Sequence, residues 1–126
     1  MWQSLIIISV GAALGACTRW GLGLMFNSVA SYFSMGTLVA NYLGCFIIGV
    51  ISALIWHYPV FSSEWRLFLV TGFLGSLTTF SAFSAEVVEK LVNQQWNIGI
   101  FIMLIHIIGC LLMTGLGIIL FRFFIK

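Results

Sequence analysis

The sequence is unusually poor in charge. Of its 126 residues, five are Lys or Arg and three are Asp or Glu, so charged residues make up only 6% of the chain, against about 25% in soluble domains. Hydrophobic residues make up 62%, and the mean hydropathy is +1.18. This composition excludes a soluble enzyme domain and predicts an integral membrane protein. The net charge of +2 is too small and scattered for a polybasic surface, so we expect no nucleic-acid partner.

Proline and cysteine are also scarce. The single proline, Pro59, lies between two long apolar runs. The three cysteines, Cys17, Cys45 and Cys110, each lie within an apolar run, without the CxxC or Cys/His spacing of a metal site. We therefore interpret them as small residues of the core.

Apolar runs account for nearly all of the sequence. A helix needs about 20 apolar residues to cross a bilayer, so the chain has room for four crossings and little else. We predict an all-α membrane protein with a single domain, 1–126. Its four transmembrane helices are expected at about 5–25, 36–56, 65–88 and 98–124.

The few basic residues give almost no orientation signal. With four spans, Arg66, Arg122 and Lys126 lie on one side of the membrane, and Arg19 and Lys90 lie toward the other. Orientation follows the Lys/Arg bias, which is negligible here. We therefore expect insertion in both orientations, and an antiparallel homodimer in the lipid membrane, since two-fold pairing is the commonest symmetric assembly.

The stretch GFLGSLTTFSAFS, from Gly72 to Ser84, is the least typical part of the third span. It has two glycines, five hydroxyl side chains and three phenylalanines, a poor composition for a helix facing lipid. Because each glycine costs about 1 kcal/mol of helix propensity relative to alanine, we predict a break between Gly72 and Thr78. Carbonyl groups freed by a broken membrane helix can bind a cation.

The second half of this stretch combines rings and hydroxyls. On a helix, Phe80 and Phe83 form one row, and Ser81 and Ser84 form a neighbouring row. Ring edges carry positive charge and hydroxyls donate hydrogen bonds, so the surface can solvate a small anion without holding it as tightly as a buried cation would. Ordinary packing of the rings, and bonding of the hydroxyls to their own helix, are the alternatives.

Three other polar residues lie within the spans, and each has two interpretations. Asn41 either joins helices by hydrogen bonds or donates into a pathway. His106 is either a satisfied core residue or part of a pore. Arg19 either extends to the headgroups or attracts anions to a vestibule.

Three motifs together resemble the fluoride channel family known as Fluc or CrcB. They are GTLVANYLG from Gly36 to Gly44, GxxxGxxxRW ending at Arg19 and Trp20, and GFLGSLTTFSAFS. The resemblance covers essentially the whole chain. It implies a passive, fluoride-selective channel of the bacterial cytoplasmic membrane, built as a dual-topology antiparallel homodimer with two pores and a structural sodium ion at its centre.

The resemblance also assigns roles to residues by motif position. Backbone carbonyls of Gly75 and Thr78 would hold the sodium ion. The fluoride pore would include Asn41, Phe80, Phe83, Ser81 and Ser84, to which we add Thr79 and His106 as polar neighbours, and Arg19 at a vestibule. Ala82 stands where many members of the family have threonine, so one hydroxyl of the polar track is missing.

Two other classes of function remain as alternatives. A small multidrug-resistance-type exporter also has four spans, but proton-coupled export needs a carboxylate inside the membrane. Glu64 lies in a loop, and Glu86 and Glu89 lie where the third span ends, so only Glu86 is a weak candidate. A passive structural subunit is the third possibility, and it predicts no ion flux. None of these functions is enzymatic.

Overall fold

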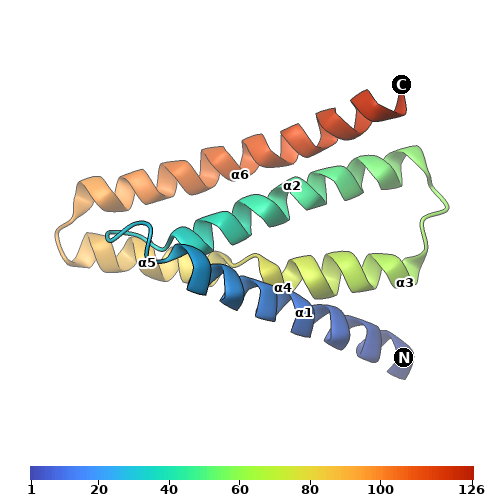
Figure 1. Ribbon diagram of the computed structural model, residues 1–126, viewed down its shortest axis with the longest axis horizontal. Helices are drawn as coiled ribbons and strands as arrows, with labels where there is room; N and C mark the ends of the chain where they lie inside the picture. The colour runs from blue at the N-terminus through green and yellow to red at the C-terminus, as the bar shows by residue number, and fades with distance from the viewer.

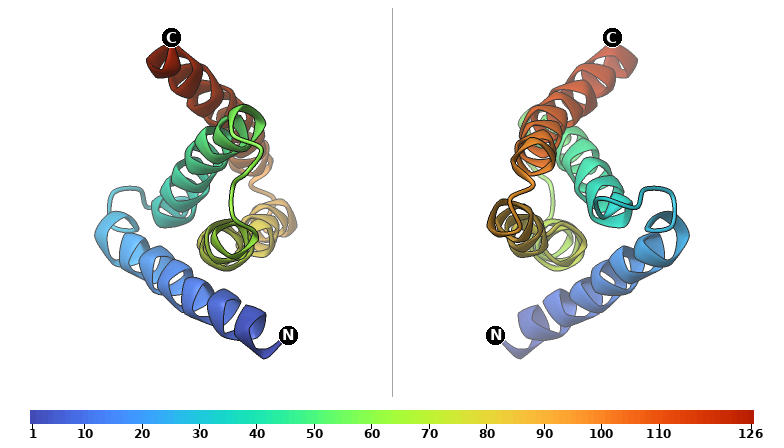
Figure 2. Two further views of the ribbon diagram at one scale, coloured as in Figure 1. Left: turned by 90° about the vertical axis from the view of Figure 1, so that its right-hand side faces the viewer. Right: turned by 90° about the vertical axis from the view of Figure 1, so that its left-hand side faces the viewer.

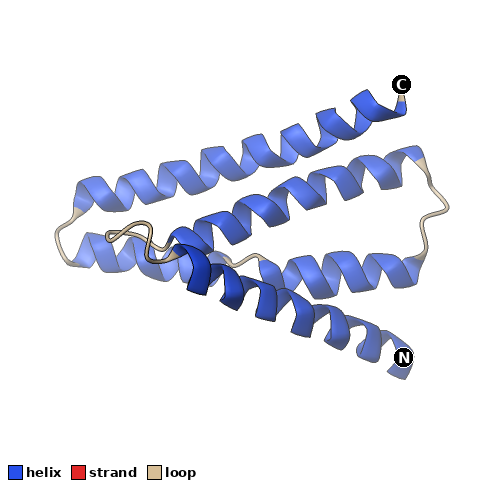
Figure 3. Ribbon diagram, viewed as in Figure 1, coloured by secondary structure: helices blue, strands red, loops and turns tan.

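The computed structural model describes all 126 residues, and all of its regular structure is helical (Figures 1 and 3). Four helical spans are long and apolar enough to cross a membrane, which confirms the predicted all-α, four-span architecture. Each span exceeds its predicted bounds by a few residues. The elements are α1 (Trp2–Phe26), α2 (Met35–His57), α3 (Ser63–Arg66), the π-helical η1 (Leu67–Leu74), α4 (Gly75–Leu77), α5 (Phe80–Val92) and α6 (Trp96–Ile125).

The spans run back and forth along one axis. Both termini and the loop at 58–62 lie at one end of the molecule, and the loops at 27–34 and 93–95 lie at the other (Figure 1). Viewed end-on, α6 lies along α2, while α1 lies across the third span (Figure 2). Arg66, Arg122 and Lys126 therefore lie toward the end that holds both termini, and Arg19 and Lys90 lie toward the other end, as expected.

Glycines allow α1 to lie directly against the third span. A Cβ on Gly11 would lie 2.5 Å from the Phe68 carbonyl oxygen, and one on Gly72 would lie 2.7 Å from the Ile8 carbonyl oxygen. Membrane helices use small residues for such backbone approach, since lipid gives no hydrophobic drive for helix association. The contact falls on η1, where the helix has π-type hydrogen bonds.

The helices α2 and α6 run in the same direction and pack closely (Figure 1). Gly49 lies against the backbone of Thr114, and the Tyr42 hydroxyl donates to the Ile105 carbonyl at 2.5 Å. Further toward the start of both helices, Asn41 contacts His106. The contact between Asn41 and His106 and the contact between Gly49 and Thr114 are therefore about two turns apart on each helix.

The irregular backbone in the third span lies beyond the glycines. Gly72 lies in the π-helical η1, and Gly75 is helical at φ −61° and ψ −29°, so the break begins only at Thr78, the last residue of the predicted range. Thr78 (φ −83°, ψ 151°) and Thr79 (φ −147°, ψ 117°) are extended instead. Gly72 serves the close packing on α1, which outweighs its low helix propensity, whereas a Cβ at Gly75 would have only the Val70 carbonyl oxygen within 4 Å. Thr79 is a suitable N-cap for the next helix.

The glycine contact gives a first prediction. Gly11→Ala places a methyl group against η1 and should lower the free energy of unfolding by about 1–3 kcal/mol, as overpacking does. Gly21→Ala is the matched control, since nothing lies within 4 Å of a Cβ at that position. Unfolding in mixed detergent micelles measures both. Equal stability of the two variants would contradict the close packing of α1 on η1.

Candidate functional site

The side chain of Asn41 completes the hydrogen bonds of the extended segment. The Thr79 N–H donates to Asn41 Oδ1 at 2.8 Å, and Asn41 Nδ2 donates to the Thr79 carbonyl at 3.1 Å. Asn41 is buried, with 7% of its surface exposed. Unpaired backbone groups are costly at membrane depth, so this amide of α2 replaces the helical bonds that the extended backbone gives up.

Two backbone carbonyl groups near the interruption lack the hydrogen-bond donor that a continuous helix would give them. In a continuous helix the Gly75 carbonyl would accept from the Thr79 N–H, which here donates to Asn41. The Thr78 carbonyl accepts no hydrogen bond in the structure. Both residues line one hollow of about 250 Å³. Its other lining residues are Gly44, Cys45, Ile48, Val70 and Leu74.

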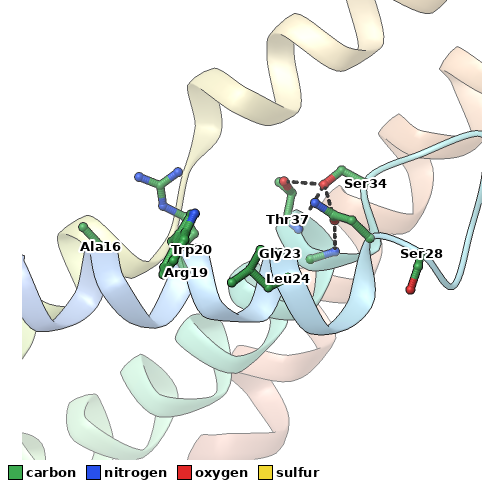
Figure 4. Close-up of a pocket in the computed structure, with 10 residues that line it drawn as sticks. Ala16, Arg19, Trp20, Gly23, Leu24, Ser28, Ser34 and Thr37 are labelled. Carbon is green, nitrogen blue, oxygen red and sulfur yellow. Dashed lines mark hydrogen bonds between the residues drawn. The ribbon is translucent and has the colours of Figure 1, made fainter.

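Arg19 reaches from α1 to the end of α4, just before the interruption (Figure 4). Its Nε donates to the Ser76 carbonyl at 3.1 Å, and the contact is partly buried. A cation is stabilised at a helix C-terminus by the partial negative charge of the last carbonyls. Arg19 is therefore held by the protein, and the N–H groups of its guanidinium other than Nε have no protein acceptor.

The hydrogen bonds of Asn41 also determine which nitrogen of His106 carries the proton. Asn41 Nδ2 lies 3.3 Å from His106 Nδ1. The backbone of Thr79 fixes the orientation of the amide, so its NH₂ group faces the ring. Nδ1 must then be the acceptor, and the neutral ring carries its hydrogen on Nε2.

His106 Nε2 has no partner. The side chain is 3% exposed, and Nε2 is the one buried side-chain polar atom in the protein without a hydrogen bond. Buried polar groups in native proteins are almost always paired. The protein therefore leaves one buried N–H donor unpaired within the membrane-spanning part of α6.

A cavity of about 350 Å³ brings together most of the residues that the sequence singled out. It lies between α2, α5 and α6, at the interruption of the third span. The predicted residues that line it are Asn41, Thr78, Thr79, Phe80, Phe83 and His106, and the remaining ones are Cys45, Ile107, Cys110 and Leu111.

The two phenylalanines of α5 have different environments. Phe83 is 7% exposed, and its ring centroid lies 4.4 Å from that of His106. Phe80 is 77% exposed, and it meets Phe83 edge-on with centroids 5.5 Å apart. The rings therefore form a row that runs from the buried His106 to the surface of the single chain.

The hydroxyl row is only partly connected. Thr79 Oγ1 lies 3.3 Å from Ser81 Oγ and accepts the Ala82 N–H at 3.2 Å. Thr79 thus occupies the space beside Ala82, where the row lacks a hydroxyl. The Ser84 hydroxyl makes no hydrogen bond to this pair and does not line the cavity. The structure brings Thr79 and Ser81 together, but of the three only Thr79 lines the cavity.

A second hollow, of about 650 Å³, lies beside Arg19 at one end of the molecule (Figure 4). Asn27 Oδ1 accepts from the Gly36 N–H at 2.8 Å and from Ser34 Oγ at 3.0 Å. The Ser34 N–H donates to Glu86 across the gap to α5. Sequence reasoning missed Asn27, although an asparagine at a helix end, followed by the S-x-x-T pattern of an N-cap, is a readable signal.

Fold and site together define a class: a small four-span membrane protein whose polar residues gather around an interrupted helix. The sequence model for "CrcB-like protein, Camphor Resistance (CrcB)" matches residues 6–118. The chain therefore belongs to the CrcB family, as the motifs indicated, and it is a multi-pass membrane protein and not an enzyme.

Three curated relatives carry the name "Fluoride-specific ion channel FluC". The protein of Mannheimia succiniciproducens is 64% identical over 97% of this chain and 96% of its own length. The protein of Pasteurella multocida is 62% identical over 96% and 94%, respectively. The protein of Chromohalobacter salexigens is 50% identical over 94% and 89%. The similarity thus extends over the whole domain.

The role of Asn41 gives a second prediction. Asn41→Leu keeps the number and branching of the side-chain heavy atoms but leaves both backbone groups of Thr79 unpaired. It should lower the free energy of unfolding by about 1–3 kcal/mol, the usual cost of buried unsatisfied groups. Ser9→Ala is the control, because the Ser9 hydroxyl donates to its own exposed helix. A loss in Asn41→Leu no larger than in the control would contradict the role of Asn41.

Proposed function

We propose that the protein is a passive, fluoride-selective channel that exports fluoride across the bacterial cytoplasmic membrane. The observation that carries this proposal is the cavity that Phe80 and Phe83 line together with Asn41, Thr79 and His106, beside a buried His106 Nε2 that has no partner in the chain. The names of the relatives from three bacteria point to the same ion.

The lining favours a small anion that is held weakly. The neutral His106 offers one N–H donor, and the phenylalanines offer positively polarised ring edges. No Lys or Arg lines this cavity, so the anion meets no fixed cation from which it would be slow to leave. Conduction needs sites of this weaker kind. Fluoride is the smallest halide and accepts hydrogen bonds most strongly, so an N–H donor favours it over chloride.

The polar residues on either side extend the path. Thr79 and Ser81 would donate their hydroxyls along it, with Ser84 further along α5. Arg19 would attract anions to the hollow beside it, through the guanidinium N–H groups that the protein leaves free. Asn41 would act by positioning, since both of its amide hydrogens already donate to protein groups.

A second copy of the chain would complete the pore. Phe80 is 77% exposed in the single chain, so no other part of the chain covers the outer end of the row of rings. The near-equal division of basic residues supports insertion in both orientations. We therefore propose an antiparallel homodimer with dual topology in which the partner covers Phe80.

The carbonyls of Gly75 and Thr78 suit a structural sodium ion at the dimer centre. Neither accepts the hydrogen bond that a continuous helix would supply, and carbonyl oxygens of broken membrane helices are ligands for sodium. When bound, the ion would neutralise these oxygens and join the two chains. Asn41 and Arg19 would contribute by holding the extended segment and the end of α4 in place.

Proton-coupled export by a small multidrug-resistance-type mechanism is less well supported. It needs an embedded carboxylate that exchanges protons for substrate. Glu86, its one candidate, accepts a hydrogen bond from the Ser34 N–H and does not line the cavity. Passive flux needs no such group.

Flux in liposomes tests the proposed function. Purified protein reconstituted with internal fluoride should release it down its gradient, as measured with a fluoride-selective electrode. Parallel liposomes that contain chloride should retain it, because chloride is larger and a weaker acceptor. Absent fluoride efflux, or equal chloride efflux, would contradict the proposal, and fluoride efflux driven only by a proton gradient would favour coupled transport.

Phe80 is expected to contribute to the path rather than to stability. Phe80→Ile should reduce fluoride flux at least about tenfold, corresponding to 1.4 kcal/mol at the rate-limiting barrier, while the homodimer persists in size-exclusion chromatography. Phe123→Ile is the matched control, because Phe123 is 72% exposed near the end of α6. Equal flux in the two variants would assign Phe80 to packing alone.

Removal of sodium tests the proposed central cation. With a large organic cation in place of sodium throughout purification, the dimer should unfold at a lower temperature and conduct less fluoride. Restored sodium should reverse both effects, because a ligand that binds only the folded state stabilises it. An unfolding temperature and a fluoride flux that stay the same after prolonged exchange of sodium would count against the site.

A further inference from the structure

Two cysteines that are 65 positions apart in the sequence meet beside the cavity. Cys45 lies one turn after Asn41 on α2, and Cys110 lies one turn after His106 on α6. The turns on either side of this position are in contact, through Asn41 with His106 and through Gly49 with Thr114. Since α2 and α6 run in the same direction, Cys45 and Cys110 face each other between these contacts.

Both thiols are available for chemistry. They line the same cavity of about 350 Å³. Neither forms a disulfide. Cys17, the third cysteine, is exposed on α1 and lines neither this cavity nor the hollow at Gly75. The chain therefore holds one thiol pair and one isolated thiol.

The donor set determines which metal ion can bind. Thiolate sulfur is a soft ligand and binds soft metal ions. No group of three or more His, Cys, Asp or Glu side chains is arranged around a common point, so the tetrahedral ligand set that zinc requires is absent. Two facing sulfurs match a soft d¹⁰ ion with linear, two-coordinate geometry.

Charge selects among such ions. A monovalent ion with two thiolates leaves one negative charge in a region of low dielectric, which is costly. A divalent ion with two thiolates is neutral. We propose that Cys45 and Cys110 form a site for one mercuric ion, in which the metal bridges the two sulfurs of α2 and α6.

The binding reaction balances without a redox step. Each Sγ–H bond loses its proton to solvent, two S–Hg bonds form, and two chloride ions leave if mercuric chloride is supplied. Mercury remains divalent. Because Thr78, Phe80 and Phe83 line the same cavity, the bound ion occupies space that an anion would pass. Block of fluoride flux therefore follows, and this consequence rests on the proposed function.

Intact-mass spectrometry of the purified protein tests the binding step without any flux. In a Cys17→Ser background, mercuric chloride should add one mercury per chain with loss of two hydrogens and no retained chloride. Adding Cys110→Ser or Cys45→Ser should remove this species, and any adduct on the remaining thiol should keep a chloride. A bridged species that persists in either double variant, or its absence in Cys17→Ser, overturns the site.

Fluoride efflux from liposomes tests the consequence separately. Mercuric chloride should abolish flux in Cys17→Ser, and excess dithiol should restore it. In the variants that lack Cys45 or Cys110, each measured against its own flux without mercury, a monothiol should already restore the flux, because a single S–Hg bond holds the metal less tightly than the bridge. Restoration by the monothiol that is equally complete in Cys17→Ser and in both double variants would overturn the role of the pair. A protein that binds mercury at the pair but conducts no fluoride would refute the proposed function and leave the metal site standing.

Discussion

The hydrogen bonds between the Asn41 amide and the backbone of Thr79 are the interaction on which the rest of this structure depends. A transmembrane helix that stops at Leu77 and restarts at Phe80 leaves backbone groups without partners, where no lipid can supply them. One side chain from α2 satisfies both groups of Thr79. The interruption can therefore persist, and polar backbone becomes available inside the membrane.

Two kinds of polar surface follow from this arrangement. On one side, the Gly75 carbonyl loses its helical donor because the Thr79 N–H is engaged by Asn41. On the other side, the second amide hydrogen of Asn41 donates to Nδ1 of His106, and the N–H on Nε2 of this ring, which packs against Phe83, has no partner. A single asparagine thus separates backbone acceptors that have lost their helical donors from a ring N–H donor that has no acceptor.

Much of the fold could be predicted from the sequence, because hydrophobic length directly determines the number of spans. Of the residues around the cavity, the polar ones Asn41, Thr78, Thr79 and His106 could be picked out because polar groups at membrane depth are rare, whereas Cys45, Ile107, Cys110 and Leu111 carry no such signal. The position of the irregular backbone could not be predicted. Helix propensity pointed to Gly72 and Gly75, but Gly72 packs on α1 and the extended residues are Thr78 and Thr79. The pairing of Cys45 with Cys110 was out of reach, because it depends on the register of α2 against α6.

The most direct test of the central role of Asn41 is nitrogen NMR of the His106 ring in lipid bilayers. If Asn41 donates to Nδ1, the neutral ring must carry its hydrogen on Nε2, and this N–H signal should shift when fluoride is added but not when chloride is added. A hydrogen on Nδ1, or an Nε2–H signal that fluoride leaves unchanged, would contradict the proposed link between the interrupted helix and the anion path.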